Sequence, residues 1–240
     1  MSEPSFFMTS AALEAFDVLG RTVDEVGATT VLFGESGSGR STVLREYGLG
    51  RGRGRAVLVP CPPALGPVGF LQQILDRTGG GLARSCREGL DRVVSRLRSE
   101  GLEALLLDDA HRLYKPCLEV LEEVQARSGV SLVLCGSERE LVGRLRRAPS
   151  LRARVGRVRW LRGLDREEVE DLLAASGALR LPRRDAADLL EALWEVSKGN
   201  WSRLLRVVSR CGEQAAARFQ TRLDRSTLDR AVGDLGLEAA

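Results

Sequence analysis

An eight-residue segment has the residue types and spacing of a phosphate-binding loop, Gly34-Glu35-Ser36-Gly37-Ser38-Gly39-Arg40-Ser41. It matches the pattern G-x-x-x-x-G-K-[ST] at every position except the lysine, which is an arginine here. The glycines let the backbone curl so that its N–H groups point at phosphate oxygens, and the N-terminus of the following helix adds partial positive charge. Ser41 would place its hydroxyl on Mg²⁺, with Thr42 next to it in the site. The segment predicts a nucleoside triphosphate site; the alternative is a glycine- and serine-rich turn between a strand and a helix.

A second motif is a run of leucines that ends in two acids, Leu105-Leu106-Leu107-Asp108-Asp109. Such a run predicts a buried parallel strand that delivers a carboxylate to its C-terminal end. Asp108 would hold Mg²⁺ directly or through water, and Asp109 would polarise the attacking water. The alternative is an ordinary core strand followed by a solvated acidic turn. His111 follows closely and is the only histidine of the chain; it could touch the active site or be a structural or solvated residue.

The composition describes a globular protein of one large or two small domains: 240 residues, 43% hydrophobic and 29% charged. No apolar stretch approaches the ~20 residues of a membrane span, and no secretory signal precedes the first helix. The five cysteines are odd in number and form no Cys-x-x-Cys pair, which predicts reduced thiols in a cytoplasmic protein and excludes a disulfide or zinc framework. The net charge of +3 does not by itself require nucleic acid.

Hydrophobic periodicity predicts strands that alternate with helices over the first two thirds of the chain. The expected strands cover 30–33, 56–59, 103–108, 130–135 and 155–161, and the expected helices 9–27, 41–47, 67–78, 87–99, 116–128 and 138–147. This alternation indicates an α/β fold, a parallel doubly wound sheet with helices on both faces and its ligand at the strand C-termini. From residue 165 the pattern is helical only, with helices over 165–176, 183–197, 200–211, 213–223 and 226–234. We therefore expect a nucleotide-binding domain over 1–163 and a small helical domain over 164–240.

A phosphate-loop sheet followed by a helical lid resembles the AAA+ ATPases. Four further segments resemble the DNA-transposition regulators of that group (TnsC, TniB and MuB) and the related ExeA-like ATPases. They are the lead-in 7–13, the strand end 132–137, the segment 149–154 and the lid segment 199–204. The resemblance implies that ATP and Mg²⁺ are the cofactors and that the chain forms homo-oligomers or filaments. It makes Ser137 the sensor-1 residue, Arg154 the arginine finger with Arg152 as second choice, and Arg203 the sensor-2 residue.

The chain departs from the family pattern at two groups that act in hydrolysis. The loop lysine is Arg40, whose planar guanidinium is larger than the compact ammonium that reaches between phosphates. The usual Asp-Glu pair is Asp108-Asp109, so the second carboxylate is one methylene shorter. Because the phosphate-cradling backbone and the Mg²⁺ ligands remain, we expect ATP binding with slow turnover.

The resemblance also implies contact with double-stranded DNA through basic groups between the second strand and the acidic strand. The candidates are Arg77, Arg84, Arg87, Arg92 and Arg96. Their alternative is a solvated helix face with Arg/Glu pairing. Two functions are therefore expected from the sequence. One is an ATP-dependent assembly on DNA that regulates transposition by target selection or transposase recruitment. The other is a nucleotide-switched interaction module, ExeA-like or signalling, that binds no DNA.

Overall fold

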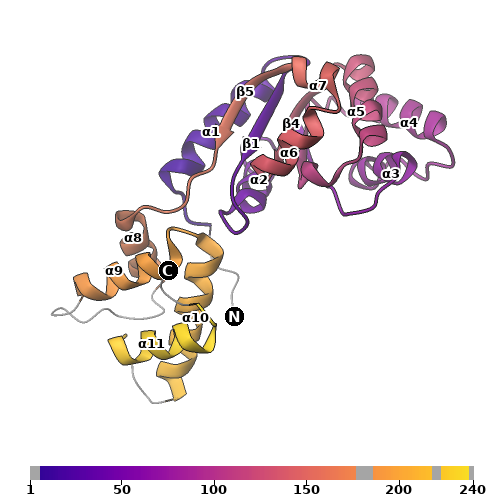
Figure 1. The fold of residues 1–240 in the computed structure, drawn as a ribbon. Helices are drawn as coiled ribbons and strands as arrows, with labels where there is room; N and C mark the ends of the chain where they lie inside the picture. The colour runs from indigo at the N-terminus through magenta and orange to yellow at the C-terminus, as the bar shows by residue number, and fades with distance from the viewer. Residues whose placement is uncertain (1–5, 177–185, 218–222, 238–240) are drawn as a thin grey trace. The chain divides into compact units, whose positions relative to one another are not determined.

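The computed structural model describes residues 6–176, 186–217 and 223–237, which form two compact units (Figure 1). One unit comprises residues 12–36 and 40–161 and contains the sheet. The other comprises the residues up to Ala11, the three residues Gly37–Gly39 and the chain from Arg162 onward. None of the described helices has the length and apolar character that crossing a bilayer requires.

In the described part of the chain, five parallel strands form one sheet in the order β2-β3-β4-β1-β5. They are β1 (Thr29–Phe33), β2 (Ala56–Pro60), β3 (Ala104–Asp108), β4 (Ser131–Gly136) and β5 (Val155–Trp160). The strands β1, β3 and β4 are almost wholly buried, as their runs of Val, Leu and Phe predict. Because all strands are parallel, the phosphate loop after β1 and the acids that end β3 lie at the same edge of the sheet.

Helices cover both faces of this sheet. The helices of this unit are α1 (Ser10–Val23), α2 (Arg40–Leu49), α3 (Pro67–Thr78), α4 (Cys86–Ser99), α5 (Lys115–Ser128), α6 (Glu138–Leu145) and α7 (Pro149–Ala153), with the 3₁₀ turn η1 (Ala110–Arg112). On one face, Leu105 and Leu107 of β3 belong to a core that α3 to α7 complete. On the other, Leu106 lies against α2 at Gly48.

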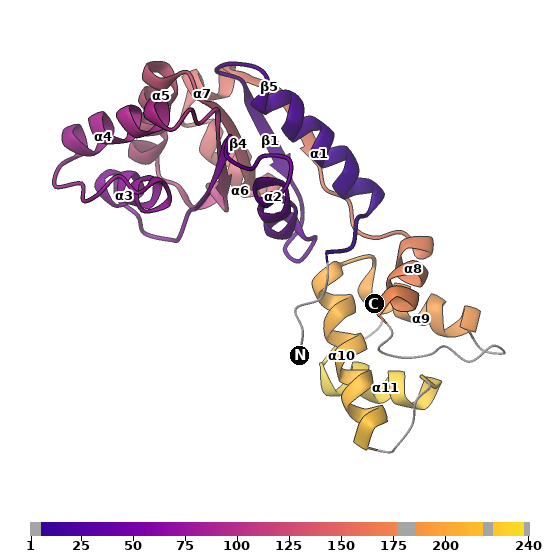
Figure 2. The same cartoon turned by 180° about the vertical axis from the view of Figure 1, so that it is seen from behind.

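The helix α1 lies along β1 and β5, as the view from behind shows (Figure 2). The hydroxyl oxygens of Thr22 and Thr30 are 2.6 Å apart in the buried layer between α1 and β1. Arg159 of β5 forms an ion pair with Glu14 of α1, and Phe16 meets the ring of Tyr47 on α2 edge-on at 5.6 Å. These contacts fix α1 and α2 as the second layer of the sheet.

The helical unit has its own apolar core, formed by α8 (Arg166–Ser176), α9 (Ala186–Ser197), α10 (Trp201–Ala217) and α11 (Arg225–Asp234). The lead-in residue Phe7 stacks on Trp201 with ring centroids 6.2 Å apart. Gly37 also belongs to this unit, where its carbonyl accepts a hydrogen bond of 3.0 Å from the Ser202 N–H.

The structure confirms the predicted strands and most helices to within one or two residues, and α3 at both ends. It corrects four details. Helix α1 ends at Val23 rather than 27, α2 continues two residues beyond its expected end at 47, and the short elements η1 and α7 were not predicted. Part of the expected helix 183–197 and of 213–223 lies outside the described residues.

The fourth correction concerns Gly212, where two helices were predicted to meet. The structure has one continuous helix, α10, across this position. Its buried stripe runs through Leu204, Val207, Val208, Cys211 and Ala215, so apolar packing continues on both sides of the glycine. Glycine in a helix interior costs only about 0.5–1 kcal/mol relative to alanine, which is less than this packing provides.

We expect Gly212→Ala to raise the free energy of unfolding by about 0.5–1 kcal/mol, because a Cβ there meets nothing within 4 Å. The matched control is Gly199→Ala, where φ is +72° and the new Cβ would lie 2.3 Å from the Leu164 carbonyl oxygen. That variant should lose at least about 1 kcal/mol. Urea unfolding followed by circular dichroism measures both. A destabilised Gly212→Ala variant would show that the helix is broken at this position.

Candidate nucleotide site

The phosphate loop has a backbone that most residues cannot adopt. Gly37 has φ +82° and Gly39 has φ +90°, in the left-handed region that favours glycine. Helix α2 begins at Arg40, directly after these turns. Ser41, the expected Mg²⁺ ligand, is exposed in the first turn of α2, and Thr42 is half-buried. Left-handed turns followed directly by a helix N-terminus are an arrangement whose free backbone N–H groups suit an anion.

Two polar atoms of the loop are buried without a hydrogen-bond partner among the described residues, the Ser38 hydroxyl oxygen and Arg40 Nη1. A buried unpaired guanidinium nitrogen is costly unless an acceptor satisfies it. Phosphate oxygens are such acceptors, and arginine pairs with them through two parallel N–H bonds. The loop therefore fits the phosphate groups of a nucleotide, with Arg40 as a donor in place of the usual lysine.

Asp108 is the last residue of β3 and Asp109 follows it, so both acids lie at the carboxyl end of the strand, as predicted. Strand β4 separates β3 from β1, so the acids lie roughly 10 Å from the end of β1 across the edge of the sheet. Asp108 Oδ1 accepts a hydrogen bond of 3.0 Å from the Asp109 N–H and keeps its second oxygen for another partner. Ser41 and Asp108 supply oxygen donors of the kind that Mg²⁺ prefers. No cluster of three His, Cys, Asp or Glu residues that could hold a metal by itself occurs among the described residues.

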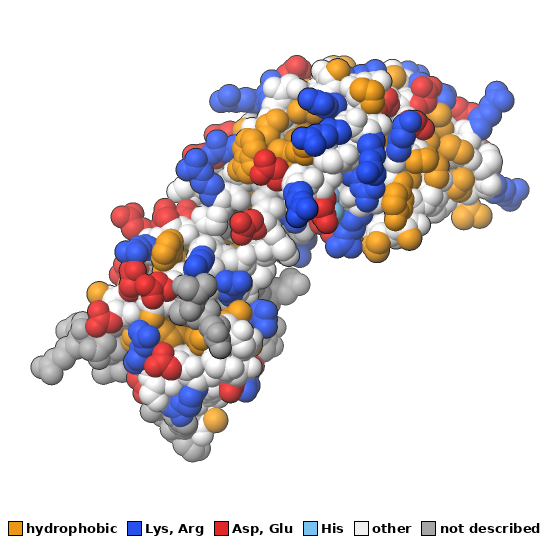
Figure 3. All heavy atoms as spheres, viewed as in Figure 1, with side chains coloured by type: hydrophobic (Ala, Val, Ile, Leu, Met, Phe, Trp, Pro, Cys, Tyr) orange, Lys and Arg blue, Asp and Glu red, His pale blue; other side chains and the backbone are white. Residues whose placement is uncertain are grey.

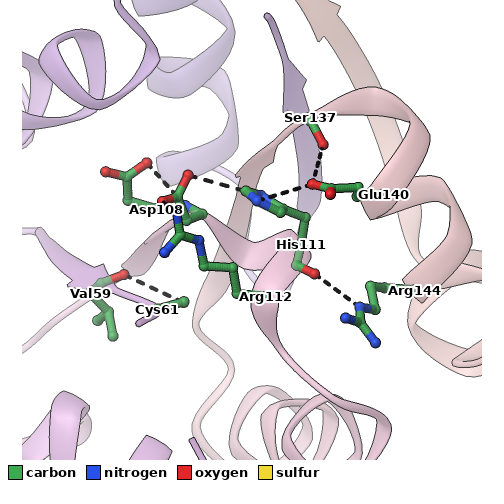
Figure 4. A network of polar contacts seen from close by, with 9 residues as sticks. Val59, Cys61, Asp108, His111, Arg112, Ser137, Glu140 and Arg144 are labelled. Atoms are coloured by element: carbon green, nitrogen blue, oxygen red, sulfur yellow. Dashed lines mark hydrogen bonds and ion pairs between the residues drawn. The ribbon is translucent and has the colours of Figure 1, made fainter. Parts of the chain in front are cut away.

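A chain of polar contacts crosses this edge of the sheet (Figure 4). The Ser137 hydroxyl donates to Glu140 Oε2 at 2.7 Å. The same oxygen lies 3.2 Å from His111 Nε2, and His111 Nδ1 lies 3.9 Å from Asp109 Oδ1. Arg112 Nη2 pairs with the other oxygen of Asp109 at 3.1 Å. The contacts connect the expected sensor-1 residue to the second acid of the leucine strand.

The position of His111 depends on Gly136, the last residue of β4. A Cβ at Gly136 would lie 2.9 Å from His111 Nδ1 and 3.2 Å from His111 Cβ, closer than such atoms approach. The sequence interpretation left open whether His111 touches the site, and the structure places it between two of the acidic side chains. Three further residues of this site were not predicted from the sequence: Glu140, Arg112 and Gly136. The spacing Ser137-x-x-Glu140 was a usable signal, since residues three apart meet on a helix.

Asp109 adopts a left-handed backbone, with φ +55° and ψ +37°. Aspartate tolerates this conformation better than most residues because its short side chain bonds locally. The conformation ends β3 and starts η1, which turns the Asp109 carboxylate toward Arg112 and His111. The carboxylate that was expected to polarise water is thus held within its own turn.

The surroundings of His111 favour the neutral imidazole. Burial lowers its pKa below the ordinary value of 6.5, and the cations Arg40 and Arg112 lower it further, against the opposite effect of Asp109 and Glu140. Hydrogen bonding from Ser137 lowers the pKa of the Glu140 carboxyl, so that this group is ionised. A neutral imidazole therefore lies between two carboxylates.

The five cysteines are free, as predicted, and do not take part in this chemistry. Cys61 and Cys135 lie close to Asp108, and burial raises the pKa of both thiols. Burial likewise raises the pKa of Cys211 to about 11. Thiols in this state are weak nucleophiles.

Arg154 lies at the opposite edge of the sheet from the loop. It directly precedes β5, whose first residue pairs with Thr29 at the start of β1. The length of β1 therefore separates Arg154 from Gly34, roughly 15 Å. Arg154 Nη1 donates to Gln125 Oε1 at 3.2 Å, and Arg152 is exposed two residues before it. Neither arginine reaches the phosphate loop of its own chain. This is the position expected of an arginine that acts on the nucleotide of a neighbouring subunit.

Arg203 is exposed in the first turn of α10, within the helical unit. Its backbone N–H bonds Asn200 Oδ1 at 3.0 Å, and its Nη1 donates to the Val196 carbonyl at 3.4 Å. The assignment of Arg203 as sensor 2 stays a prediction, as do the roles of the other site residues.

The five arginines proposed for DNA fall into two groups. Arg92 pairs with Glu88 at 2.7 Å and Arg96 with Glu100 at 3.0 Å, both one helical turn apart. Arg96 also donates to the Thr78 carbonyl. These two arginines agree with the alternative interpretation, a solvated helix face with Arg/Glu pairing. The three others are exposed on or beside α3 and α4: Arg77, Arg84 and Arg87.

The sequence profile of the AAA domain matches residues 24–145, just over half of the chain. The chain belongs to the AAA domain family. It is an ATPase by family, and its phosphate loop, parallel sheet and helical C-terminal region agree with that assignment. No curated protein matches the sequence.

Solved structures of AAA proteins share its fold. The ORC2 protein of Aeropyrum pernix, solved in ADPNP and ADP complexes, superposes with a TM-score of 0.71 at 15% identity, over 97% of this chain and 70% of that one. The ORC1 protein of the same organism, solved in complex with DNA, gives 0.70 at 21% identity, over 94% and 64%. The RuvB Holliday junction branch migration motor of Thermotoga maritima gives 0.62 at 18% identity, over 98% and 72%. At these identities the likeness is one of fold.

For this AAA protein we expect Arg40→Lys to raise the rate of ATP hydrolysis, because lysine restores the compact cation between the phosphates. Asp109→Glu should raise it further, because the longer side chain extends the carboxylate beyond its own turn toward the attacking water. Steady-state ATPase assays measure both, with nucleotide affinity determined in parallel. Ser41→Ala is the contrasting variant and should lower the rate. A wild-type rate near the ordinary enzymatic value of about 10 s⁻¹ contradicts slow turnover.

We expect acid to destabilise the protein partly through His111. Its folded pKa lies below the ordinary 6.5, so between the two values the unfolded chain binds more protons and the free energy of unfolding falls as the pH falls. His111→Gln should show a smaller loss between pH 7 and pH 5 in urea titrations. No other histidine contributes, and Glu140 titrates below this window because its pKa is lowered from 4.5. An unchanged loss in the variant would place the acid sensitivity elsewhere.

Proposed function

We propose that this AAA protein binds ATP·Mg²⁺ at the loop 34–42 and self-associates in the ATP state. The assembly forms on double-stranded DNA and regulates transposition by target selection or transposase recruitment. Hydrolysis is slow and serves to undo the assembly.

The observation that carries the proposal is the position of Arg154 at the amino edge of the sheet, roughly 15 Å from the loop at the carboxyl edge. An arginine in this position acts on a nucleotide only when that nucleotide belongs to a second subunit. The γ-phosphate of ATP would then gain a cation that the monomer does not provide. Nucleotide bound at such a boundary stabilises the assembled state by mass action.

Slow hydrolysis follows from which groups are altered and which are kept. The two left-handed glycines of the loop and the Ser41 and Asp108 oxygens suit binding. Arg40 and Asp109 replace the groups that act on the transferred phosphate and on water. An assembly of this kind needs bound ATP to form and needs hydrolysis only to dissociate.

The DNA and transposition parts of the proposal come from the resemblance to TnsC, TniB and MuB. The segments 7–13, 132–137, 149–154 and 199–204 carry that resemblance. Repeated subunits on one duplex would sum weak phosphate contacts into useful affinity.

Arg154→Ala should weaken ATP-dependent self-association at least about tenfold, equivalent to about 1.4 kcal/mol, because it removes the cation offered to the neighbouring phosphate. Arg152→Ala is the matched control, an exposed arginine two residues away that should leave association close to wild type. Light scattering with and without ATP measures assembly, and titration with a fluorescent ATP analogue checks that the monomers still bind nucleotide.

Loss of assembly in the control but not in Arg154→Ala would transfer the role to Arg152. A wild-type protein that shows no saturable binding at millimolar nucleotide contradicts the whole proposal. One that binds ATP but stays monomeric with ATP and duplex DNA together excludes the transposition function and favours the nucleotide-switched interaction module.

A further inference from the structure

A hollow of about 590 Å³ opens at the carboxyl edge of the sheet, next to the polar chain of His111 but outside the phosphate loop. Its wall comes from three places along the chain: Pro63 after β2, the turn η1 with Tyr114, and the outward side of α6. The lining includes four arginines and one acid, and those arginines are Arg112, Arg139, Arg144 and Arg147.

Two of these arginines are fixed by contacts within the chain. Arg112 pairs with Asp109. Arg144 Nε donates to the His111 carbonyl at 2.9 Å, and its guanidinium lies over the ring of Tyr114 at 5.1 Å. The single acid, Glu140, is already engaged by Ser137. Its one negative charge acts on Arg112 and Arg144, so it does not balance the four arginines of the hollow.

The other two arginines of the hollow have no acidic or hydrogen-bonding side-chain partner among the described residues. Arg139 and Arg147 are both exposed. A second hollow of about 330 Å³ lies beside the first on the same helix, shares Arg139 and Gly143 with it, and is also lined by Glu138. It adds Arg146, which is equally unpaired in the described structure. Lys and Arg side chains gather over α6 and α7 on this face (Figure 3).

The three unpaired arginines are spaced along the chain, since Arg139 lies in the first turn of α6 and Arg146 and Arg147 follow its last residue. From Arg139 to Arg146 the helix rises about 10 Å, which corresponds to about three nucleotides of duplex at 3.4 Å each. An extended polyanion can meet all three arginines along this length, because its charges repeat at a shorter spacing than the length of the helix. Guanidinium groups match phosphate oxygens in geometry as well as charge. Tyr114, 47% exposed, adds an aromatic surface for a sugar or base.

We propose that the two hollows along α6 bind the phosphate backbone of double-stranded DNA, with Arg139, Arg146 and Arg147 as the contacting residues. This inference rests on the proposed function. It replaces the arginines around α4 with those of the α6 segment as the residues that contact DNA. Of the five arginines around α4, Arg92 and Arg96 are paired internally. The three arginines of the α6 segment have no ion pair among the described residues and, in addition, line hollows. Binding through phosphates is independent of sequence and decreases steeply with salt.

Gly143 allows a sharp test because it lies between the hollows and a Cβ there meets nothing within 4 Å. Gly143→Glu introduces a negative charge among the three arginines, and Gly143→Gln adds a side chain of the same size without the charge. Both replace a helical glycine, so neither is expected to unfold α6. A fluorescent duplex titrated in the presence of ATP at several salt concentrations gives affinity and salt slope.

We expect Gly143→Glu to bind duplex at least about tenfold more weakly than Gly143→Gln. Arg139→Ala combined with Arg147→Ala should make the slope of log K against log salt shallower by about 1.8, since each phosphate contact contributes about 0.9. ATP-driven assembly without DNA should stay at the wild-type level in all of these variants.

Three results overturn the inference. If Arg77→Ala with Arg84→Ala removes the affinity and the α6 variants retain it, DNA binds elsewhere while the proposed function stands. If Gly143→Glu prevents assembly without DNA, the hollows are a contact between subunits. If the wild-type protein assembles with ATP but binds no duplex, both this inference and the DNA part of the proposed function are wrong.

Discussion

The close approach of His111 to the end of β4 is the constraint on which the carboxyl edge of the sheet depends. Strand β4 is the central strand, between the strand of the acids and the strand of the loop. Its last residue, Gly136, has no side chain, and the imidazole of His111 occupies the space that a Cβ would need. From there the ring reaches Glu140 on one side and Asp109 on the other. Any larger residue would displace the ring and interrupt the contacts between β3 and α6.

The sheet also separates the expected nucleotide site from Arg154, the proposed arginine finger. The groups expected to hold a nucleotide lie at the carboxyl ends of β1 and β3, whereas Arg154 precedes the amino end of β5. The segment α6–α7 connects the two edges, and its buried residues Leu141, Leu145 and Leu151 anchor it in the core. Burial of each such leucine contributes about 1.5–3 kcal/mol. The arginines of this segment are therefore carried on a packed support and point away from the core.

Charge is distributed unevenly over a surface that is rich in arginine. Along α4, acids one turn away neutralise Arg92 and Arg96. Along α6, Glu140 contacts His111 and Glu138 accepts from Trp160 Nε1 at 3.2 Å. Within the described residues neither acid pairs with Arg139, Arg146 or Arg147. Exposed ion pairs contribute little to stability, but they decide which cations stay available. An almost neutral chain can in this way present one strongly basic surface.

The sequence by itself determined the elements and the family. Alternation of apolar runs with turn residues placed the five strands, because buried parallel strands need continuous apolar side chains. Pro67 and Gly79 defined both ends of α3, since each acts on its own backbone. The glycine pattern and the acids after the leucine run predicted the nucleotide site for the same local reason. The roles of Ser137, Arg154 and Arg203 in ATP chemistry stay predictions from the resemblance.

Tertiary structure decided what depends on residues far apart in the chain. Strand order brought Gly136 against His111, and no local pattern reports that contact. Packing of the helical unit carried α10 through Gly212, where the local preference indicated a break. Pairing of β5 with β1 placed Arg154 at the edge opposite the loop. Each of these outcomes comes from burial or pairing between distant segments, whose energies exceed the roughly 1 kcal/mol of local backbone preference.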